Sequence, residues 1–549
     1  MKKSKWLALA GVSLLSVGVL VACSSKSKTS SNTYNYIYTA DPETLDYLIS
    51  NKGSTTDAVT NGVDGLLEND KYGNLVPSIA KDWTVSADGL TYTYKLRKGV
   101  KWYTSDGEEY AEVTAKDFVT GLKHAADKKT ESIYLAKDSV VGLAEYFEGT
   151  DKDFSKVGVK ALDDYTLQYT LKQPEPYWNS KMTYSLFWPV NEEFLKSKGD
   201  SFGKSTDPSS ILYNGPYILK SLTAKSSIEL AKNENYWDKK NVHFDGVKLS
   251  FYDASDQESL VRNFTDGAYS QARLYPTSSN FDSVEKQYKD NIFYTQPSAD
   301  IGGVGVNIDR QSYNHTSKKT DAEKDSTKKA LLNKDFRQSV NFAIDRTAYS
   351  AQLNGEKGAA LAVRNLLVKP DFVYAGDKSF GDLVTEKMAS YGDEWSGVNF
   401  KDSQDGIFNA DKAKAEFNKA KEALQGQGVQ FPIHLDLPVD QAAKPTVARA
   451  QSLKQSVEKT LGKENVVVDV HQMSQDDLLN STLYAANAAA EDWDINISVA
   501  WAPDYEDPST FLDIFKTTAS ENTKTYMGFD DPNNAAAAQV GLKDFDALV

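Results

Sequence analysis

The chain has 549 residues, of which 40% are hydrophobic and 25% charged, a balance typical of folded globular proteins and a length that predicts two or three domains. The formal net charge of −15 argues against a nucleic-acid partner, because phosphate backbones are bound through clustered Lys and Arg. Cys23 is the only cysteine, which excludes an internal disulfide, so stability must come from apolar burial in a large core.

The N-terminus has the order of an export signal. Lysines within the first five residues precede an uncharged apolar run of about 16 residues, at 6–21, which ends at the small residue Ala22. A helix needs roughly 20 apolar residues to cross a bilayer, so the run is too short for a permanent span. Residues 1–22 are therefore predicted to be a signal peptide that exports the chain.

The tetrapeptide Leu20-Val21-Ala22-Cys23 resembles the lipobox of bacterial lipoproteins, in which cleavage precedes the cysteine and its thiol carries a diacylglycerol. A chance cysteine near the cleavage site is the alternative. The resemblance implies that Cys23 is lipidated, with acyl chains such as palmitate. Acyl chains bind at about 0.8 kcal/mol per buried methylene, so two would anchor the protein permanently to the extracytoplasmic face of the cell membrane. Residues 23–33 are mostly Ser, Thr, Lys and Asn and are predicted to be a flexible tether.

The first half of the folded part is predicted to contain β-strands. The segment 89–102 alternates polar and apolar residues between the turns Asp88-Gly89 and Lys98-Gly99, which predicts a hairpin. The same alternation predicts strands at 165–171 and 227–231.

Helices are predicted between and after these strands. Thr114 is expected to be the N-cap of one helix, with Asp117 completing a variant of the capping box. Further helices are predicted at 336–343 and at 411–424, where apolar residues recur on one face.

The second half alternates strands with helices. Strands are predicted at 304–308, 433–437, 466–470 and 493–499, an order typical of an α/β layer built on parallel strands. The polar segment 315–325 has no apolar periodicity and is predicted to be a surface insertion.

The strongest candidate site follows the apolar strand at 495–500. Trp501 and Asp504 stand where that strand is expected to break at Pro503. Ligands of α/β layers usually bind at strand ends. The alternative is a turn aspartate beside a core tryptophan.

No catalytic, metal or cofactor site is predicted. The five histidines are scattered without zinc-ligand spacing, there is no Gly-x-Ser-x-Gly elbow, and the segment 199–205 misses the P-loop spacing by one residue. Adjacent acids such as Glu108 and Glu109 leave a secreted, lipid-anchored hydrolase as the enzymatic alternative.

Six blocks occur in the order found in the solute-binding proteins of bacterial peptide ABC transporters, family 5 of the extracellular solute-binding proteins. Over most of its length the chain resembles the large oligopeptide-binding class of that family. The blocks are NLVPSIAKDW at 74–83, SADGLTYTYKLRKGVKW at 86–102, VTAKDF at 113–118, NGPY at 214–217 with KNENYW at 232–237, VNI at 306–308 with DFRQSVNFAIDR at 335–346, and WAPDY at 501–505.

This resemblance implies an α/β fold with two lobes, the class II periplasmic-binding-protein type that binds large peptides, with an extra subdomain in the first lobe. The expected divisions are domain Ia at 34–67 and 208–302, domain Ib at 68–207, and domain II at 303–549. Since chains of that family return to the first lobe, we expect this C-terminal return to be missing from the sequence.

The resemblance also implies a function. A monomer would capture an oligopeptide between its lobes and deliver it to the permease subunits of an ABC transporter, without catalysis. Asp504 would bind the peptide α-ammonium group, and the segments 496–502 and 36–41 would pair with the peptide backbone. The expected ligand contacts are Ala500, Trp501, Ala502, Asp504, Tyr505, Tyr38 and Thr39. Binders of dipeptides, nickel complexes and oligosaccharides share the fold and stay open as alternatives.

Overall fold

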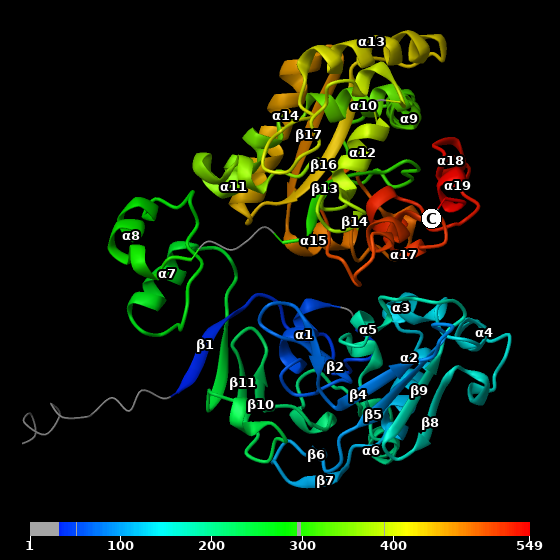
Figure 1. Ribbon diagram of the computed structural model, residues 1–549. Helices are drawn as coiled ribbons and strands as arrows, with labels where there is room; N and C mark the ends of the chain where they lie inside the picture. The colour runs from blue at the N-terminus through cyan, green and yellow to red at the C-terminus, as the bar shows by residue number, and fades with distance from the viewer. Residues whose placement is uncertain (1–31, 51, 294–297, 389, 549) are drawn as a thin grey trace, which may run out of the picture.

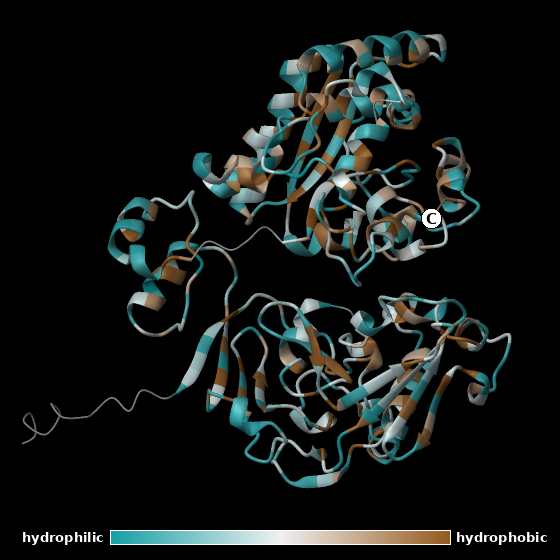
Figure 2. Ribbon diagram, in the orientation of Figure 1, coloured by the Kyte–Doolittle hydropathy of each residue, from teal (hydrophilic) through white to brown (hydrophobic). Residues whose placement is uncertain are grey.

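The computed structural model describes residues 32–50, 52–293, 298–388 and 390–548 (Figure 1). The predicted signal peptide, Cys23 and most of the predicted tether lie outside the described residues. The chain forms two lobes, the first coloured blue to green and the second green to red. Each lobe has its own apolar core, and hydrophobic residues concentrate on the strands inside the lobes (Figure 2).

The first lobe contains two four-stranded sheets. One has the order β1 (Thr33–Tyr38), β12 (Gly246–Phe251), β11 (Ser227–Lys232) and β10 (Tyr217–Thr223). The other has the order β4 (Ala80–Val85), β5 (Thr91–Leu96), β9 (Thr166–Thr170) and β8 (Val159–Asp163). Only β1 and β12 among these pairs run parallel. One apolar cluster underlies both sheets, so the region predicted as an extra subdomain shares the core of the lobe.

The strand predictions for the first lobe are confirmed at β5, β9 and β11. The predicted hairpin over 89–102 is wrong in its pairing. Across the Asp88-Gly89 turn β5 pairs with β4, and its other edge is occupied by β9. The chain after Lys98-Gly99 therefore leaves this sheet, and β6 (Lys101–Tyr103) pairs with β7 (Glu109–Glu112).

The helix predicted to begin after Thr114 is confirmed as α2 (Ala115–Asp127). The Thr114 backbone N–H donates to the Asp117 carboxylate at 3.0 Å, which closes the predicted capping box. The Trp102 indole N–H donates to the same carboxylate at 3.0 Å, so the cap also joins the helix to the core. The other helices of this lobe are α1 (Gly53–Val59), α3 (Tyr134–Lys137), α4 (Leu143–Glu148), α5 (Trp178–Lys181) and α6 (Glu192–Lys198).

Two helices, α7 (Glu258–Thr265) and α8 (Phe281–Tyr288), stand beside the lobes where the chain crosses from the first to the second (Figure 1). Within the described residues, no helix combines the length and apolar character needed to cross a membrane.

The second lobe is built on β16 (Ile433–Asp440) and β17 (Val466–Met473), which pair in parallel, and on β13 (Ile301–Val306) and β18 (Ile495–Trp501), which pair antiparallel. The predicted parallel arrangement is therefore confirmed for the first pair and wrong for the second. Helix α14 (Lys444–Leu461) joins β16 to β17 as a crossover, which imposes the parallel direction. Between β13 and β18 the chain passes through β16, α14 and β17, so no single crossover helix imposes a parallel direction on that pair.

Helices precede, separate and follow the strands of the second lobe along the chain. The predictions at 336–343 and 411–424 are confirmed as α10 and α13, and the apolar face of α13 is buried. Besides α14, the helices of this lobe are α9 (Asp321–Leu332), α10 (Lys334–Ala343), α11 (Arg346–Gly358), α12 (Phe380–Met388), α13 (Ala410–Gly426), α15 (Gln475–Ser481), α16 (Ser509–Leu512), α17 (Ser520–Met527), α18 (Ala535–Gln539) and α19 (Leu542–Asp546).

The prediction that the segment 315–325 lies at the surface is confirmed for residues 319–322 and 325, which are exposed, and wrong for Lys318. The Lys318 side chain has 0% exposure, and Thr320 caps α9 through a capping box with Glu323. Polar residues are buried here because their partners are acids from remote strands and loops, which local periodicity does not reveal.

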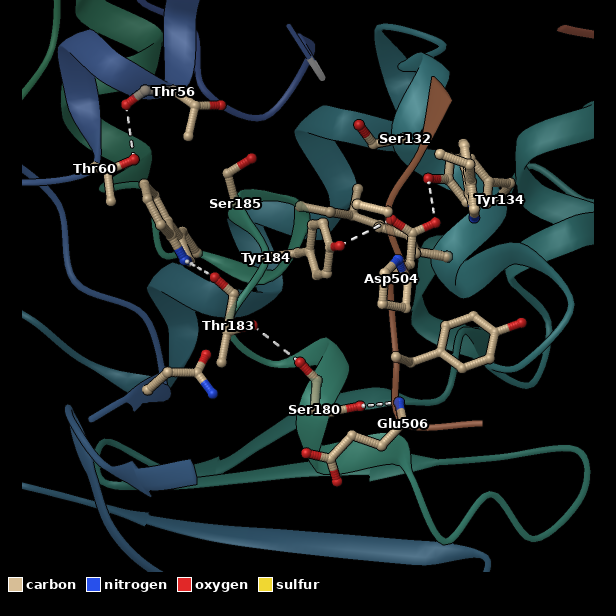
Figure 3. Close-up of a pocket in the computed structure, with 18 of the residues that line it drawn as sticks. Thr56, Thr60, Ser132, Tyr134, Ser180, Thr183, Tyr184, Ser185, Asp504 and Glu506 are labelled. Atoms are coloured by element: carbon tan, nitrogen blue, oxygen red, sulfur yellow. Dashed lines mark hydrogen bonds between the residues drawn. The ribbon is translucent and has the colours of Figure 1, made fainter. Parts of the chain in front are cut away.

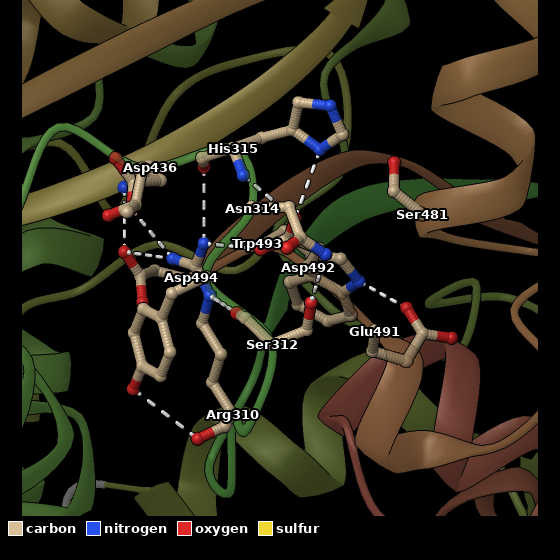
Figure 4. A network of polar contacts seen from close by, with 12 residues as sticks. Arg310, Ser312, Asn314, His315, Asp436, Ser481, Glu491, Asp492, Trp493 and Asp494 are labelled. Atoms are coloured by element: carbon tan, nitrogen blue, oxygen red, sulfur yellow. Dashed lines mark hydrogen bonds and ion pairs between the residues drawn. The ribbon is translucent and has the colours of Figure 1, made fainter.

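These partners form a buried ionic cluster of Arg310, Lys318, Asp436, Asp492 and Asp494. Figure 4 shows Arg310 with the three aspartates. Arg310 lies 2.7 Å from Asp436, 2.8 Å from Asp492 and 3.0 Å from Asp494. Lys318 pairs with Asp436 at 2.7 Å and also with Asp494. The cluster ties the segment before α9 to β16 and to the start of β18.

Candidate ligand-binding site

A cavity of about 620 Å³ lies between the two lobes and is called here the inter-lobe cavity. Thr56, Tyr134, Ser180 and Tyr184 are among the side chains that the first lobe contributes. Residues 500–506 form most of the wall from the second lobe. Both lobes must therefore be in place for the cavity to be complete.

The segment that carries Asp504 is fixed to the second lobe by Thr510. Strand β18 ends at Trp501, two residues before Pro503. The Trp501 indole N–H donates to the Thr510 carbonyl at 2.8 Å, and the Asp504 backbone N–H donates to the Thr510 hydroxyl at 2.8 Å. The loop is thereby held in a defined position at the end of the strand.

The Asp504 carboxylate faces the first lobe and accepts two hydrogen bonds from it (Figure 3). The Tyr134 hydroxyl donates to Oδ2 and the Tyr184 hydroxyl donates to Oδ1, each at 2.8 Å. Burial raises the pKa of Asp504, and the two hydroxyls and the charge of Lys181 offset this only in part. A carboxylate offers about four acceptor positions, and these two hydroxyls use two of them.

Tyr505 connects the lobes beside Asp504. Its ring stacks on Tyr177 with centroids 4.7 Å apart and an interplanar angle of 17°. The Lys181 ammonium lies 4.7 Å from the Tyr505 ring centroid and 2.9 Å from the Glu175 carboxylate. The Tyr505 side chain belongs to the apolar core of the first lobe, although the residue follows a strand of the second.

The structure brings together five of the residues singled out from the sequence. Ala500, Trp501, Ala502, Asp504 and Tyr505 all line the inter-lobe cavity, and their role as ligand contacts stays a prediction.

Two other predicted contacts, Tyr38 and Thr39, lie outside the lining of this cavity. Tyr38 is 3% exposed, and its hydroxyl donates to Asp41 at 3.0 Å. A contact of either residue with a ligand likewise stays a prediction.

Sequence reasoning missed Tyr134 and Tyr184. They lie 370 and 320 residues from Asp504 along the chain, and no spacing pattern links single tyrosines to an aspartate over such separations. Within the described part of the chain, no group of three or more His, Cys, Asp or Glu side chains is placed to hold a metal ion.

Comparison with known proteins gives a consistent assignment. The family model described as "Bacterial extracellular solute-binding proteins, family 5 Middle" matches residues 74–523. The chain is 69% identical over 552 residues to the oligopeptide-binding protein AmiA of Streptococcus pneumoniae serotype 4, covering 100% of this chain and 84% of AmiA. It is 63% identical over 557 residues to the oligopeptide-binding protein SarA of Streptococcus gordonii, with the same coverage of 100% and 84%.

The fold is shared with solved structures. The structure of Listeria monocytogenes OppA bound to peptide matches with a TM-score of 0.68 and 24% identity, covering 95% of this chain and 90% of that one. The predicted two-lobed α/β fold of the large solute-binding type is thereby confirmed. Because the family model spans well over half of the sequence, the chain belongs to family 5 of the bacterial extracellular solute-binding proteins.

Proposed function

We propose that this protein is an extracytoplasmic, lipid-anchored solute-binding protein that captures oligopeptides between its lobes and delivers them to the permease of an ABC transporter. The observation that carries the proposal is the Asp504 carboxylate, which is half-buried just after the end of β18 and lines a cavity formed by both lobes. An ammonium group is the natural partner of such a carboxylate, and every unblocked peptide has one. The relatives named as oligopeptide-binding proteins support the choice of ligand.

The peptide backbone supplies the remaining affinity in this proposal. Main-chain hydrogen bonds to an extended peptide are independent of its side chains, so they suit a carrier of many sequences. Each contributes only about 1 kcal/mol net, so several are needed. Residues 496–502, which include the end of β18, are the proposed partner strand because they lead directly to Asp504.

Mass spectrometry of ligand co-purified with the folded protein tests the proposal. We expect peptides, recovered intact after incubation because the protein does not hydrolyse them. A co-purified oligosaccharide or nickel complex would contradict peptide as the ligand, and cleavage products would favour the hydrolase alternative.

The proposed anchor predicts that Cys23→Ala abolishes fatty-acid labelling and leaves the protein soluble or held only by an uncleaved signal. The thiol is the atom that would carry the diacylglycerol, and Cys23 lies outside the described residues. Detergent-phase partitioning measures the change. Ser24→Ala is the matched control and should retain the label; persistent labelling of the Cys23 variant would contradict the lipobox assignment.

Peptide affinity should fall as the solution becomes acidic. Burial raises the pKa of Asp504 above the ordinary value near 3.9, so the ionised form that attracts an ammonium is lost at a higher pH than in an exposed aspartate. Peptide affinity is therefore highest at pH values above the raised pKa of Asp504 and declines as the pH falls through that pKa. Calorimetry across this range checks the decline, and an N-acetylated peptide, which has no ammonium, should not show it.

A further inference from the structure

Tyr505 belongs to the second lobe along the chain, but its ring packs in the first lobe. The residue follows β18, and it is 9% exposed within the apolar cluster of the first lobe. Its hydroxyl donates to the carboxylate of Asp513, which lies in the second lobe directly after α16. Burial raises the pKa of this hydroxyl, so it stays protonated and remains a donor. The side chain therefore spans the boundary between the lobes, with its hydroxyl bound in one and its ring in the other.

The first lobe offers a specific site for this ring, formed by Tyr177 and Lys181 and called here the ring socket. Tyr177 stacks on Tyr505 with centroids 4.7 Å apart and 17° between the ring planes. The Lys181 ammonium lies 4.7 Å from the Tyr505 centroid, compared with 5.2 Å for Tyr177 and 5.7 Å for Trp178. A cation is attracted to the face of an aromatic ring, most strongly where water is excluded. Of these three rings, the one nearest the ammonium thus comes from the other lobe.

The ring socket is held together by groups of the first lobe. Lys181 is 4% exposed, and its ammonium lies 2.9 Å from the Glu175 carboxylate and donates to the Ser139 hydroxyl at 3.1 Å. A buried ammonium needs such partners, because an uncompensated buried charge is strongly destabilising. When the lobes separate, Lys181 keeps Glu175 and Ser139 and exchanges the Tyr505 ring for water. The socket can therefore persist in an open form, ready to receive the ring again.

The residues on either side of Tyr505 also contact the first lobe, through polar groups. The Asp504 carboxylate accepts hydrogen bonds from two tyrosine hydroxyls, and the Glu506 backbone N–H donates to the Ser180 hydroxyl at 3.3 Å. Such groups bond to water when the lobes part, so each contact contributes little net stability to closure. A buried aromatic ring has no equivalent partner in water. Tyr505 is therefore the residue of this segment whose contact favours the closed form most.

We infer that Tyr505 is a clasp that holds the two lobes closed and thereby sets the affinity of the site for every ligand. Apparent affinity is proportional to the fraction of molecules in the form that is competent to bind. A residue that stabilises the closed form therefore strengthens binding without contacting the ligand. It also slows release, because the ligand leaves when the lobes part. The inference rests on the proposed function for its effect on peptides, whereas closure itself is a property of the chain.

Hydrogen exchange of the full chain in the absence of peptide tests the clasp directly. Tyr505→Ala removes the ring, so we expect faster exchange in the segments 177–181 and 504–506, which face each other across the lobe boundary. Exchange in β5 and β16, inside the two lobes, should not change, which distinguishes opening from unfolding. Tyr374→Ala is the matched control, because it removes the same atoms from a tyrosine of the second lobe that is 63% exposed. It should leave exchange in all these segments as in the wild type.

Peptide binding gives the second readout. Tyr505→Ala should weaken alanine-based hexapeptides by about tenfold, with the same factor whether their N-terminus is free or acetylated, because both need the closed form. Stopped-flow dissociation should become faster as well. Tyr505→Phe keeps the ring and should stay close to the wild type in exchange and in affinity. Unequal factors for free and acetylated peptides would mean that Tyr505 contacts the ligand, and would contradict a role through closure alone.

Tyr177→Ala perturbs the same contact from the first lobe, so it also serves if Tyr505→Ala does not fold. Its effects on exchange and affinity should match those of Tyr505→Ala, and the double variant should be no worse than either, because both delete one contact. Unchanged exchange in both single variants would overturn the clasp, whatever the peptides do. Faster exchange together with failure of the wild type to bind any peptide would uphold the clasp and overturn the proposed function.

Discussion

Asp504→Asn should weaken peptide binding by about two to three orders of magnitude. At about 4 Å and an effective dielectric constant near 20, a unit-charge pair is attracted by roughly 4 kcal/mol before desolvation is subtracted. Removing one partner of a buried pair typically costs about 3–5 kcal/mol, because the other charge is left stranded. The burial that raises the pKa of Asp504 is the same burial that makes its charge effective toward an ammonium ion.

A four-way thermodynamic cycle by calorimetry isolates this interaction. N-acetylated peptides should bind the wild type as poorly as free peptides bind Asp504→Asn, and the two losses should not add because both delete the same contact. The cycle is needed because the substitution also disturbs the hydrogen bonds from Tyr134 and Tyr184. Fully additive losses would mean that Asp504 only holds the lobes together and that the amine is bound elsewhere.

Glu506→Gln is the matched control for this cycle. Glu506 lines the same cavity two residues away but is exposed, so its charge is screened by water. Its loss should change affinity by less than about tenfold. An effect as large as that of Asp504→Asn would show that the cavity attracts the ligand through its overall negative charge rather than through one carboxylate.

The parts of the fold that could be predicted from the sequence depend on neighbouring residues. The alternation around Tyr92 and Tyr94 defines a strand because successive side chains point to opposite faces, and both tyrosines are buried in β5. The capping box of Thr114 and Asp117 spans four consecutive residues and forms as predicted. In the same way, the end of β18 before Pro503 follows from local geometry, and it places Asp504 at a strand end.

The parts that could not be predicted depend on partners that are remote in the chain. The pairing of β5 with β4 and β9 is decided by which strand edges are free, which no local pattern encodes. The tyrosines that bond Asp504 come from the other lobe. The wall of the inter-lobe cavity likewise combines residues from both lobes, so the cavity appears only after folding.

Lys318, in the second lobe, is another residue whose burial could not be predicted from neighbouring residues. A polar segment without apolar periodicity usually lies at the surface, because a buried charge needs partners. Here Asp436 and Asp494 supply them from more than 100 residues away. Burial would raise the pKa of Asp436, but the hydrogen bond from His471 and the charges of Lys318 and Arg310 outweigh it and hold that pKa well below its usual range.

Arg310→Met should lower the free energy of unfolding of the second lobe by about 3–5 kcal/mol. The Arg310 side chain is 2% exposed and pairs with Asp436, Asp492 and Asp494. Without it, Lys318 is left as the one lysine or arginine of the cluster against three buried carboxylates. Methionine fills similar volume, so the loss reports stranded charge more than an empty space. Urea unfolding followed by fluorescence and circular dichroism measures the change.

Arg262→Met is the control that separates a buried from an exposed charge. Arg262 pairs with Asp256, but its side chain is 59% exposed, so its removal should leave the free energy of unfolding close to that of the wild type. The prediction is the difference between the two variants in their free energy of unfolding, because each substitution removes the same atoms and the same formal charge. Similar shifts for both variants would mean that water reaches the cluster and screens it, and the three carboxylates would then not depend on Arg310. A large shift for Arg310→Met alone would identify the cluster as the contact that holds the segment before α9 onto β16 and β18.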